Sequence, residues 1–550
     1  MPGRRRSRAL LIVGAAAAAV ALGAGVIVVV SSESGGAERP EVPHFVDETA
    51  TAGIDHRYTG GARYFEGGGV AAFDCTGDAN PELYVAGGEE PAALFRNDSV
   101  TGGALRFTRL PSDVTDLPAV TGAYPIDLDG DDVVDLAVLR DGEDVLLRGL
   151  GGCSFERANE RFGLDGADSW TVAFSATWEG SNTLPTLAFG DYRTADGDDC
   201  TDSRLFRPTE QGGTYAAPFS FHPGYCTLSI LFTDWHRTGQ RDLRMANDRN
   251  YYRDGSEQLW RIVPGETPTL YGDADGWRPL QIWGMGIASQ DLTGDGLPEV
   301  FLTSQADNKL QTLVAGSTGP TYEDIALRLG VTAHRPFAGD DVLPSTAWHP
   351  EFADVNNDGY LDLFITKGNV EAEPGYALRD PDNLLLGRPD GTFVEVAEDA
   401  GILNFVGSRG AVVVDLDADG LLDLVVVNRE EPVTVWHNVG AGEPGDPAPM
   451  GNAVELRLHQ PGPNVDAIGA WVEARIGDRT VAHEVTIGGG HASGELGWIH
   501  LGLGTSAQVP IRVQWPDGEV GPWIDVAAGA RVTIERGSDA AVPWSPAAGS

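Results

Sequence analysis

The sequence predicts an all-β protein whose residues 45–440 form a seven-bladed β-propeller. Three observations predict this fold. An acidic loop recurs along the chain, a short apolar run follows most copies, and an aromatic-led segment recurs with the same rhythm. Short apolar runs bounded by turn residues are typical of buried strands. Units of about four short strands, repeated around a ring, form the blades of a propeller.

The acidic loops begin at Asp74, Asp127, Asp291, Asp354 and Asp415, and each carries oxygen-bearing side chains at positions 1, 3, 5 and 9. Carboxylates held this close repel one another unless a cation lies among them. Oxygen-only ligands suit a hard cation, and calcium best, so we expect about three to five calcium ions. The predicted ligands are Asp74, Thr76, Asp78, Glu82, Asp127, Asp129, Asp131, Asp135, Asp291, Thr293, Asp295, Glu299, Asp354, Asn356, Asp358, Asp362, Asp415, Asp417, Asp419 and Asp423.

Two alternatives for these loops were weighed. An EF-hand needs a bidentate Glu at position 12, but that position is apolar in all five loops and lies in a strand-like run. Metal-free turns rich in Asp and Gly would explain a single copy, but five copies with one shared spacing favour a cation. Thr76 and Thr293 replace an acid or amide at position 3, so their loops are expected to bind more weakly.

The spacing of the loops sets the blade count. The gap between Asp127 and Asp291 is about three repeats long, and it contains two eroded copies beginning at Trp178 and Asp234. Seven starts then fall at 74, 127, 178, 234, 291, 354 and 415. We expect no calcium in the two eroded copies. A repeat of about 57 residues indicates one continuous array.

An aromatic-led segment repeats in step with the loops and predicts how the ring closes. Its copies begin at Phe45, Phe155, Tyr322 and Phe393. The first copy has no blade before it, and the last loop has no copy after it. We therefore expect the Phe45 segment to supply the outer strand of the seventh blade. An open array would leave unpaired strand edges at both ends.

The loops and the preceding run 67–74 (GGGVAAFD) resemble FG-GAP/VCBS repeats, the calcium-loop blades also found in integrin α-chain propellers. Residues 451–535 resemble an ASPIC/UnbV domain through 469–475 (GAWVEAR), 500–504 (HLGLG) and 511–518 (IRVQWPDG). Together they resemble the cartilage acidic protein family, whose bacterial members are exported. The resemblance implies a seven-bladed β-propeller followed by a small C-terminal β domain. The eroded loops and an insertion around 191–214 depart from the pattern.

The N-terminus predicts export. Four arginines precede an uncharged apolar run at 9–30, so residues 1–31 form an export signal or an N-terminal membrane anchor. The run is long enough to cross a bilayer, which favours an uncleaved single-span anchor over a cleaved peptide. Residues 32–44 are expected to be a linker, and 536–550 a disordered tail. The body is then extracellular or on the cell surface, where calcium is plentiful.

The net charge limits the possible partners, and the cysteine content predicts disulfide bonds. The net charge of −43 excludes nucleic acid as a partner. Four cysteines allow three disulfide pairings in an oxidising compartment. Cys200 and Cys226 flank the insertion, which favours that pair and leaves Cys75 with Cys153.

No hydrolase elbow, zinc-protease motif or P-loop is present, so we expect no enzyme. The predicted function is an exported, calcium-binding module, expected to be monomeric, for adhesion or for recognition of a protein or glycan. The alternatives are an extracellular enzyme acting on polysaccharide and a purely structural envelope protein. The eroded fourth blade is rich in aromatic and basic residues, which could form a ligand-binding surface or could serve only packing within the blade. The candidate ligand residues are His236, Arg237, Tyr251, Tyr252 and Arg253.

Overall fold

The computed structural model describes residues 40–194, 199–248, 255–371, 373–443 and 446–545. The predicted export segment lies outside these residues. Among the residues described, no helix is long and apolar enough to span a bilayer.

Seven four-stranded antiparallel units form the propeller, which confirms the predicted fold class. Blade 1 contains β2 (Val70–Phe73), β3 (Glu82–Val85), β4 (Ala93–Asn97) and β5 (Phe107–Arg109). Blade 2 contains β6 (Val120–Ile126), β7 (Asp135–Gly142), β8 (Val145–Gly149) and β9 (Phe155–Arg157). Blade 3 contains β10 (Ser169–Thr177), β11 (Thr186–Thr194), β12 (Ser203–Phe206) and β13 (Phe219–Phe221). Blade 4 contains β14 (Thr227–Thr233), β15 (Asp242–Asn247), β16 (Gln258–Arg261) and β17 (Thr269–Leu270). Blades 2 and 3 are joined through a short pairing of β7 with β10.

The remaining blades repeat this order. Blade 5 contains β18 (Gly284–Gln290), β19 (Glu299–Ser304), β20 (Lys309–Leu313) and β21 (Tyr322–Asp324). Blade 6 contains β22 (Ala347–Ala353), β23 (Asp362–Lys367), β24 (Asn383–Gly387) and β25 (Phe393–Glu395). Blade 7 contains β26 (Ser408–Val414), β27 (Asp423–Asn428), β28 (Thr434–Asn438) and β1 (Phe45–Asp47). The short helices are η1 (Gly61–Arg63), α1 (Asn159–Phe162), η2 (Asp273–Asp275), α3 (Ala326–Leu329) and α4 (Ala397–Ala400).

The N-terminal strand closes the ring as the sequence predicts. Phe45 pairs with Asn438 and Asp47 pairs with Trp436, so β1 is the outer strand of blade 7. The other aromatic-led segments form β9, β21 and β25, each the outer strand of its blade. Closure leaves neither end of the array with an unpaired edge.

Each acidic loop connects the first and second strands of a blade, and its ninth residue begins the second strand. The inner strands are buried along nearly their whole length, and large side chains such as Tyr84, Phe174 and Phe364 fill the space between neighbouring sheets. The strands therefore hold all seven loops at one end of the ring.

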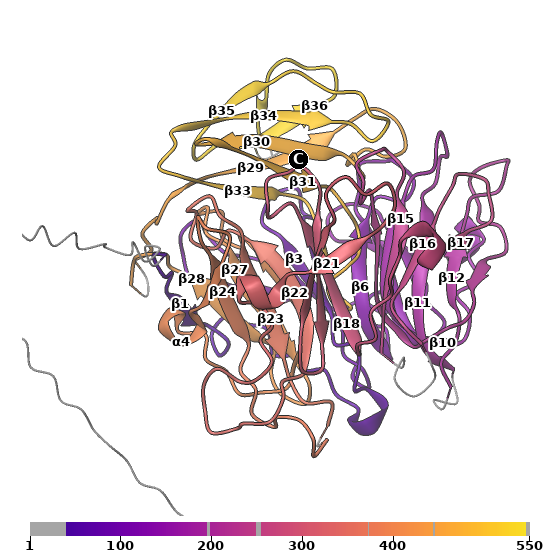
Figure 1. The fold of residues 1–550 in the computed structure, drawn as a ribbon, viewed down its shortest axis with the longest axis horizontal. Coiled ribbons are helices and arrows are strands. Elements are labelled where there is room, and N and C mark those ends of the chain that lie inside the picture. The colour runs from indigo at the N-terminus through magenta and orange to yellow at the C-terminus, as the bar shows by residue number, and fades with distance from the viewer. Residues whose placement is uncertain (1–39, 195–198, 249–254, 372, 444–445, 546–550) are drawn as a thin grey trace, which may run out of the picture. The chain divides into compact units, whose positions relative to one another are not determined.

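The C-terminal part forms two further four-stranded sheets, drawn in orange to yellow in Figure 1, at the loop end of the blades. The strands are β29 (Asn452–His459), β30 (Trp471–Ile476), β31 (Arg479–Glu484), β33 (Ile499–Gly504), β34 (Gln508–Gln514), β35 (Ile524–Ala527), β36 (Arg531–Glu535) and β37 (Val542–Pro543). Strand β37 pairs with β36, so the expectation of disorder from residue 536 is wrong for 536–545. Residues 546–550 lie outside the described residues.

A segment of this C-terminal part, residues 485–497, runs through the centre of the propeller; we call it the channel segment. Its strand β32 (Gly494–Leu496) pairs in parallel with β2 of blade 1. Isolated bridges join it to the first strands of four more blades: Ala123 pairs with Ser493, Ala176 with Ile487, Leu231 with Gly488 and Ile287 with Gly490. The innermost strands would otherwise present unpaired backbone groups to the channel, and the segment satisfies part of them.

Histidines at the centre of the channel are hydrogen-bonded and neutral. His491 is fully buried: its Nε2 accepts from Gly67 N at 3.1 Å, its Nδ1 lies 3.2 Å from the carbonyl of Met285, and its backbone N–H donates to Nδ1 of His349 at 3.0 Å. Burial lowers the pKa of His491 to about 3 and that of His349 to about 4. Both side chains hold the channel segment in place only in their neutral form.

We therefore expect these two histidines to reduce the stability of the calcium-saturated protein in mild acid. Between pH 6.5 and 4 the unfolded chain binds more protons at these histidines than the folded chain, so the free energy of unfolding falls as pH falls through this window. The loss is about 2 kcal/mol per histidine by pH 5. Urea unfolding at pH 7.5, 6 and 5 measures it as the difference in pH dependence between wild-type protein and His491→Gln. The difference is needed because burial raises the pKa of Glu351 to about 7 and that of Glu257 to about 8, and these acids contribute with the opposite sign in this window. A slope unchanged by this variant would contradict the assignment.

Candidate metal centres

The five acidic loops share one backbone conformation. Their fourth and sixth residues are both in the left-handed region, as in Gly130 and Asp132 (φ 72° and 62°) or Ala418 and Gly420 (φ 59° and 85°). Two such residues flanking position 5 turn the chain sharply and direct successive polar groups inward. Small or Asx residues at these positions lower the strain of a positive φ.

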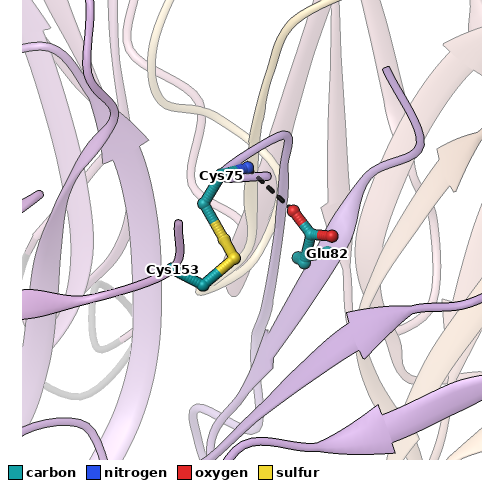
Figure 2. Close-up of side chains that lie close together, drawn as sticks. All are labelled: Cys75, Glu82 and Cys153. Carbon is teal, nitrogen blue, oxygen red and sulfur yellow. Dashed lines mark hydrogen bonds between the residues drawn. A yellow bond between two sulfur atoms is a disulfide. The ribbon is translucent and has the colours of Figure 1, made fainter. Parts of the chain in front are cut away.

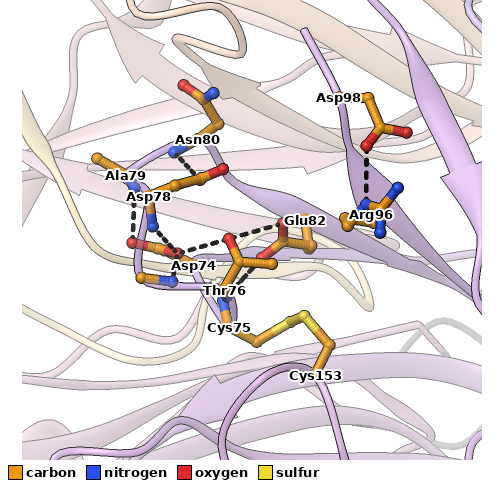
Figure 3. Close-up of a disulfide and its surroundings, with 11 residues drawn as sticks. Asp74, Cys75, Thr76, Asp78, Ala79, Asn80, Glu82, Arg96, Asp98 and Cys153 are labelled. Carbon is orange, nitrogen blue, oxygen red and sulfur yellow. Dashed lines mark hydrogen bonds and ion pairs between the residues drawn. A yellow bond between two sulfur atoms is a disulfide. The ribbon is translucent and has the colours of Figure 1, made fainter. Parts of the chain in front are cut away.

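Backbone N–H groups hold the first and last acids of each loop. In the blade 1 loop, Asp74 accepts from the N–H groups of Gly77, Asp78 and Ala79 at 2.6–3.2 Å, as Figure 3 shows. Glu82 at position 9 accepts from Cys75 N at 2.8 Å. The equivalent bonds recur in the other four loops; in blade 7, for example, Gly420 N donates to Asp415 and Leu416 N donates to Asp423. The carboxylates are therefore held together even though their charges repel.

Several carboxylate oxygens in these loops have no hydrogen-bond partner although they are buried. They are Oδ1 of Asp129 in blade 2 and both side-chain oxygens of Asp417 in blade 7. One ligand atom each from Asp127, Asp129 and Asp135 lies within 4.8 Å of the others, and the same holds for Asp415, Asp417 and Asp423. Buried carboxylate oxygens without a donor are costly, and a calcium ion with oxygen ligands at 2.3–2.6 Å would satisfy them. The donor sets thus fit the predicted ion.

Burial raises the pKa of the acids at positions 1 and 9 of every loop. Burial, with neighbouring Asp74 and Asp78, raises the pKa of Glu82 to about 8, and burial, with Asp127 and Asp129, raises that of Asp135 to about 8. Burial and nearby carboxylates raise the pKa of Asp423 well above its ordinary value. Without a cation these groups retain protons near neutral pH. Binding of a divalent ion would therefore release protons.

One third-strand position in each blade faces the loop and differs between blades. Loop position 10 pairs with a residue of the third strand, and the position meant is the next residue of that strand. In blade 7, for example, Leu424 pairs with Trp436, so the position is His437. From blade 1 to blade 7 its occupants are Arg96, Arg148, Arg207, Arg261, Thr312, Leu386 and His437. The sequence pattern of the loops does not include this position, because only the strand register brings it to the loop.

In two of the complete loops this position places a nitrogen-bearing side chain against the carboxylates. In blade 2, Arg148 donates through Nε to Asp129 at 2.8 Å and also pairs with Asp131, so a guanidinium already offsets part of that loop's charge. The loop that begins at Asp127 is therefore less dependent on a cation than its four acids suggest. In blade 7, Nε2 of His437 lies 3.4 Å from Oδ2 of Asp417.

The eroded loops lack the ligand set, as expected. In blade 4, Asp242 accepts from the indole N–H of Trp235 and the hydroxyl of Tyr271, both at 2.8 Å. In blade 3, Glu179 is paired with Arg207. Neutral donors or an arginine replace the cation in these two blades.

The candidate ligand surface of blade 4 is not formed by the two of its residues that the structure describes, Arg237 and His236. Arg237 is largely buried against the C-terminal sheets, where it pairs with Glu473 at 2.5 Å and its guanidinium lies 4.9 Å from the ring centre of Trp471. Its neighbour His236 stacks edge-on against Trp235. Arg237 therefore joins the propeller to the C-terminal sheets and is not open to a ligand. Tyr251, Tyr252 and Arg253 lie outside the described residues.

The C-terminal sheets contact the acidic loops directly. The contacts join Arg531 to Asp415 (3.2 Å), His459 to Asp132 (3.2 Å), His500 to Asn357 (2.6 Å) and Arg479 to the carbonyl of Gly359. The loops of blades 2, 6 and 7 therefore lie at an internal interface. An ion bound there would also stabilise the docking of the C-terminal sheets.

Comparison with protein families agrees with this architecture. Residues 291–365, which contain the loops of blades 5 and 6, match the FG-GAP-like repeat, and residues 460–541 match ASPIC and UnbV. The chain therefore contains an FG-GAP-like repeat region and a C-terminal ASPIC/UnbV domain. No curated protein matches the sequence.

The FG-GAP propeller also has weak structural similarities. One is to BBS1N in complex with ARL6DN (12% identity, 71% of this chain and 96% of that chain, TM-score 0.40). Another is to an Agrocybe aegerita lectin that recognises non-reducing terminal N-acetylglucosamine (15%, 65% and 88%, 0.37), and a third is to a fucose-specific lectin from Aleuria aurantia (13%, 60% and 95%, 0.33). These scores are too low to assign a ligand.

Two disulfides reinforce the FG-GAP propeller: Cys75–Cys153 and Cys200–Cys226. The favoured pairing is thus confirmed. Cys75 is the second residue of the blade 1 loop, and its N–H donates to Glu82 (Figure 2). Because both sulfurs are bonded to each other, the cysteines close to Glu82 are not metal ligands. The bond links the blade 1 loop to the turn between β8 and β9 of blade 2.

Replacing both Cys75 and Cys153 by Ser should lower the free energy of unfolding by about 4 kcal/mol, because the bond closes a long loop of the unfolded chain. It should also weaken cation binding in the blade 1 loop, since the disulfide holds in place residue 75, whose backbone N–H orients Glu82. Chemical denaturation and calcium titration measure the two effects. The Cys200→Ser/Cys226→Ser protein is the matched control, and it should lose stability without losing any calcium site.

A cavity of about 570 Å³ lies between the FG-GAP propeller and the ASPIC/UnbV domain. It contains a carboxyl pair outside the loops: Glu351 of β22 and Glu495 of the channel segment share a hydrogen bond, and His349 Nε2 lies 3.1 Å from Glu351. Burial raises the pKa of Glu351 to about 7. No sequence motif indicates these residues, because β32 reaches β22 only through the tertiary fold.

Proposed function

We propose that this protein is an exported, calcium-stabilised FG-GAP propeller that acts as a binding module for a protein or glycan. The observation that carries the proposal is the shared loop geometry. Each of the five loops holds its buried carboxylates through the same set of backbone N–H groups, and three carboxylate oxygens in these loops have no hydrogen-bond donor. A calcium ion in each complete loop would neutralise the acids and hold the turn between two strands. Export to a calcium-rich, oxidising compartment is consistent with both disulfides.

The cavity is the proposed recognition site. Its volume falls within the range of small-ligand pockets, and its lining combines aromatic side chains such as Tyr360 and Trp498 with charged ones such as Arg479 and Asp478. Arg479 stacks on Tyr360 at 3.7 Å from the ring centre, which gives a flat, partly polar platform. Aromatic platforms beside hydrogen-bonding groups suit a sugar ring or a peptide side chain. Loops with bound calcium would set the shape of this site because four of them line it.

Three measurements test the proposal. Elemental analysis should find about three to five calcium ions per chain. Glycan-array and pull-down screens should identify a partner whose binding is lost on chelation and weakened in Arg479→Ala. Arg475→Ala, which removes an arginine stacked on Trp523 in the C-terminal sheets, is the matched control and should bind normally. A protein without bound calcium, or one that binds nothing in either screen, would contradict the proposal; empty screens would favour a purely structural envelope role.

An enzyme acting on polysaccharide is the second candidate, favoured by the carboxyl pair in the cavity. The spacing argues against ordinary glycoside hydrolysis, because hydrogen-bonded carboxyls are closer than the roughly 5–9.5 Å that such enzymes use. We therefore expect no glycosidase activity from wild-type protein on polysaccharide panels. Turnover that is abolished in Glu351→Gln and Glu495→Gln would reverse this conclusion.

A further inference from the structure

Blade 7 contains a nitrogen ligand that the other loops lack. His437 of β28 and Asp417 and Asp419 of the loop each present one ligand atom within 4.8 Å of the others. This set differs from the oxygen-only set of Asp415, Asp417 and Asp423 in the same loop. At the equivalent third-strand positions the other loops have Arg96, Arg148, Thr312 or Leu386, none of which supplies a nitrogen ligand.

The polar atoms of this set are buried and unpartnered. His437 is 2% exposed and Asp417 is 1% exposed. Nε2 of His437 and both carboxylate oxygens of Asp417 have no hydrogen-bond partner. Asp419 is partly exposed and gives solvent access to the site.

The second ring nitrogen of His437 is held by a carboxylate. Nδ1 lies 3.3 Å from Oε1 of Glu48, the residue that follows β1. Leu105 N donates to the other oxygen of Glu48 at 2.6 Å, so this carboxylate is fixed in place. A histidine that donates Nδ1–H to a carboxylate presents the lone pair of Nε2 to its other neighbour, which is the usual arrangement of metal-bound histidines.

Nε2 faces Oδ2 of Asp417, and a cation between these two atoms, either a metal ion or a proton on the imidazole, would offset the carboxylate charge. A protonated imidazole hydrogen-bonded to Asp417 would sit at about 2.7–2.9 Å, whereas the observed separation is 3.4 Å and the two atoms form no hydrogen bond. Two ligands about 2.1 Å from one tetrahedral zinc ion are roughly 3.4 Å apart. The local charge also favours a cation. Arg531 pairs with Asp415 of the loop, but it does not pair with the other acids near His437, which are Asp417, Asp419, Asp423 and Glu48.

We propose that blade 7 binds a divalent transition-metal ion, with zinc as the best match, through His437, Asp417 and Asp419, with Glu48 orienting the imidazole. Imidazole favours zinc over calcium, whereas the oxygen-only loops favour calcium. The N-terminal strand that closes the ring thus also supplies the residue that positions the histidine. The ion would connect β28, the blade 7 loop and, through Glu48, the closing strand.

The test is zinc binding to the full chain in the presence of saturating calcium. Equilibrium dialysis against micromolar zinc and millimolar calcium, followed by elemental analysis, should find one zinc ion in wild-type protein. His437→Gln should lose it, whereas His334→Gln should retain it; His334 is a matched control because it is an exposed histidine paired with Asp307. Anomalous scattering at the zinc edge should locate the ion at His437 without any variant.

Three outcomes would overturn the proposal: no zinc bound in calcium, zinc retained in full by His437→Gln, or anomalous density away from blade 7. If His437→Gln fails to fold, Asp419→Asn and the anomalous map decide the question. Zinc and calcium would share Asp417 and Asp419, so zinc takes the place of calcium in blade 7 and the calcium proposal then rests on the other four loops. Zinc bound to a protein that contains no calcium would leave this inference standing and remove the other.

Discussion

Removing calcium with a chelator should lower the melting temperature by roughly 5 °C. Extracellular calcium sites have dissociation constants near 10⁻⁴ M, so about 2 mM calcium stabilises each occupied loop by about 2 kcal/mol. Three such sites contribute about 5 kcal/mol or more. The effect is large because the loops of blades 6 and 7 also contact the C-terminal sheets through His500 and Arg531.

Calorimetry with and without chelator measures this shift, and readdition of calcium, not magnesium, should reverse it. Asp362→Asn should remove one ion and reduce the chelator effect. Asp242→Asn in the eroded loop of blade 4 is the matched control: it should destabilise the protein, since Asp242 accepts from Trp235 and Tyr271, and leave the calcium count unchanged. A melt insensitive to chelator would contradict the calcium assignment.

Adding a methyl group at either of two inner-strand glycines should displace the channel segment. A Cβ on Gly69 would lie 1.8 Å from the carbonyl oxygen of Ala492, and a Cβ on Gly122 would lie 2.2 Å from the same oxygen. Neither glycine has a positive φ, so the effect is a clash and not backbone strain. We expect Gly69→Ala or Gly122→Ala to cost about 3 kcal/mol.

Thermal melting and limited proteolysis of the segment 485–497 measure this effect. Gly272→Ala is the matched control, because a Cβ there meets no atom within 4 Å and its φ of −143° is ordinary. The control should melt like the wild type. If Gly69→Ala and Gly122→Ala also melt normally and resist protease, the channel segment is not a stabilising part of the propeller.

Local features of the sequence were sufficient to predict the propeller and its acidic loops. The ligand spacing, the apolar strand after each loop and the aromatic-led outer strand are all short-range patterns, and each blade repeats them. Repetition made even the eroded loops at Trp178 and Asp234 recognisable, and the unmatched segment at Phe45 predicted ring closure, which β1 confirms. The disulfide pairing followed from position in the array.

Only the tertiary structure revealed the features that depend on strand register or on contacts between segments distant in the sequence. Arg148 and His437 occupy the same place in two blades but reach their loops only through strand pairing, so the loop spacing does not reveal them. Arg237 was considered as a ligand residue and instead joins the ASPIC/UnbV domain. Residues 485–497 enter the channel, where Glu495 contacts Glu351 although more than a hundred residues separate the two in the sequence. A repeat specifies its own blade because the contacts are local, whereas the filling of the channel depends on a segment outside every repeat.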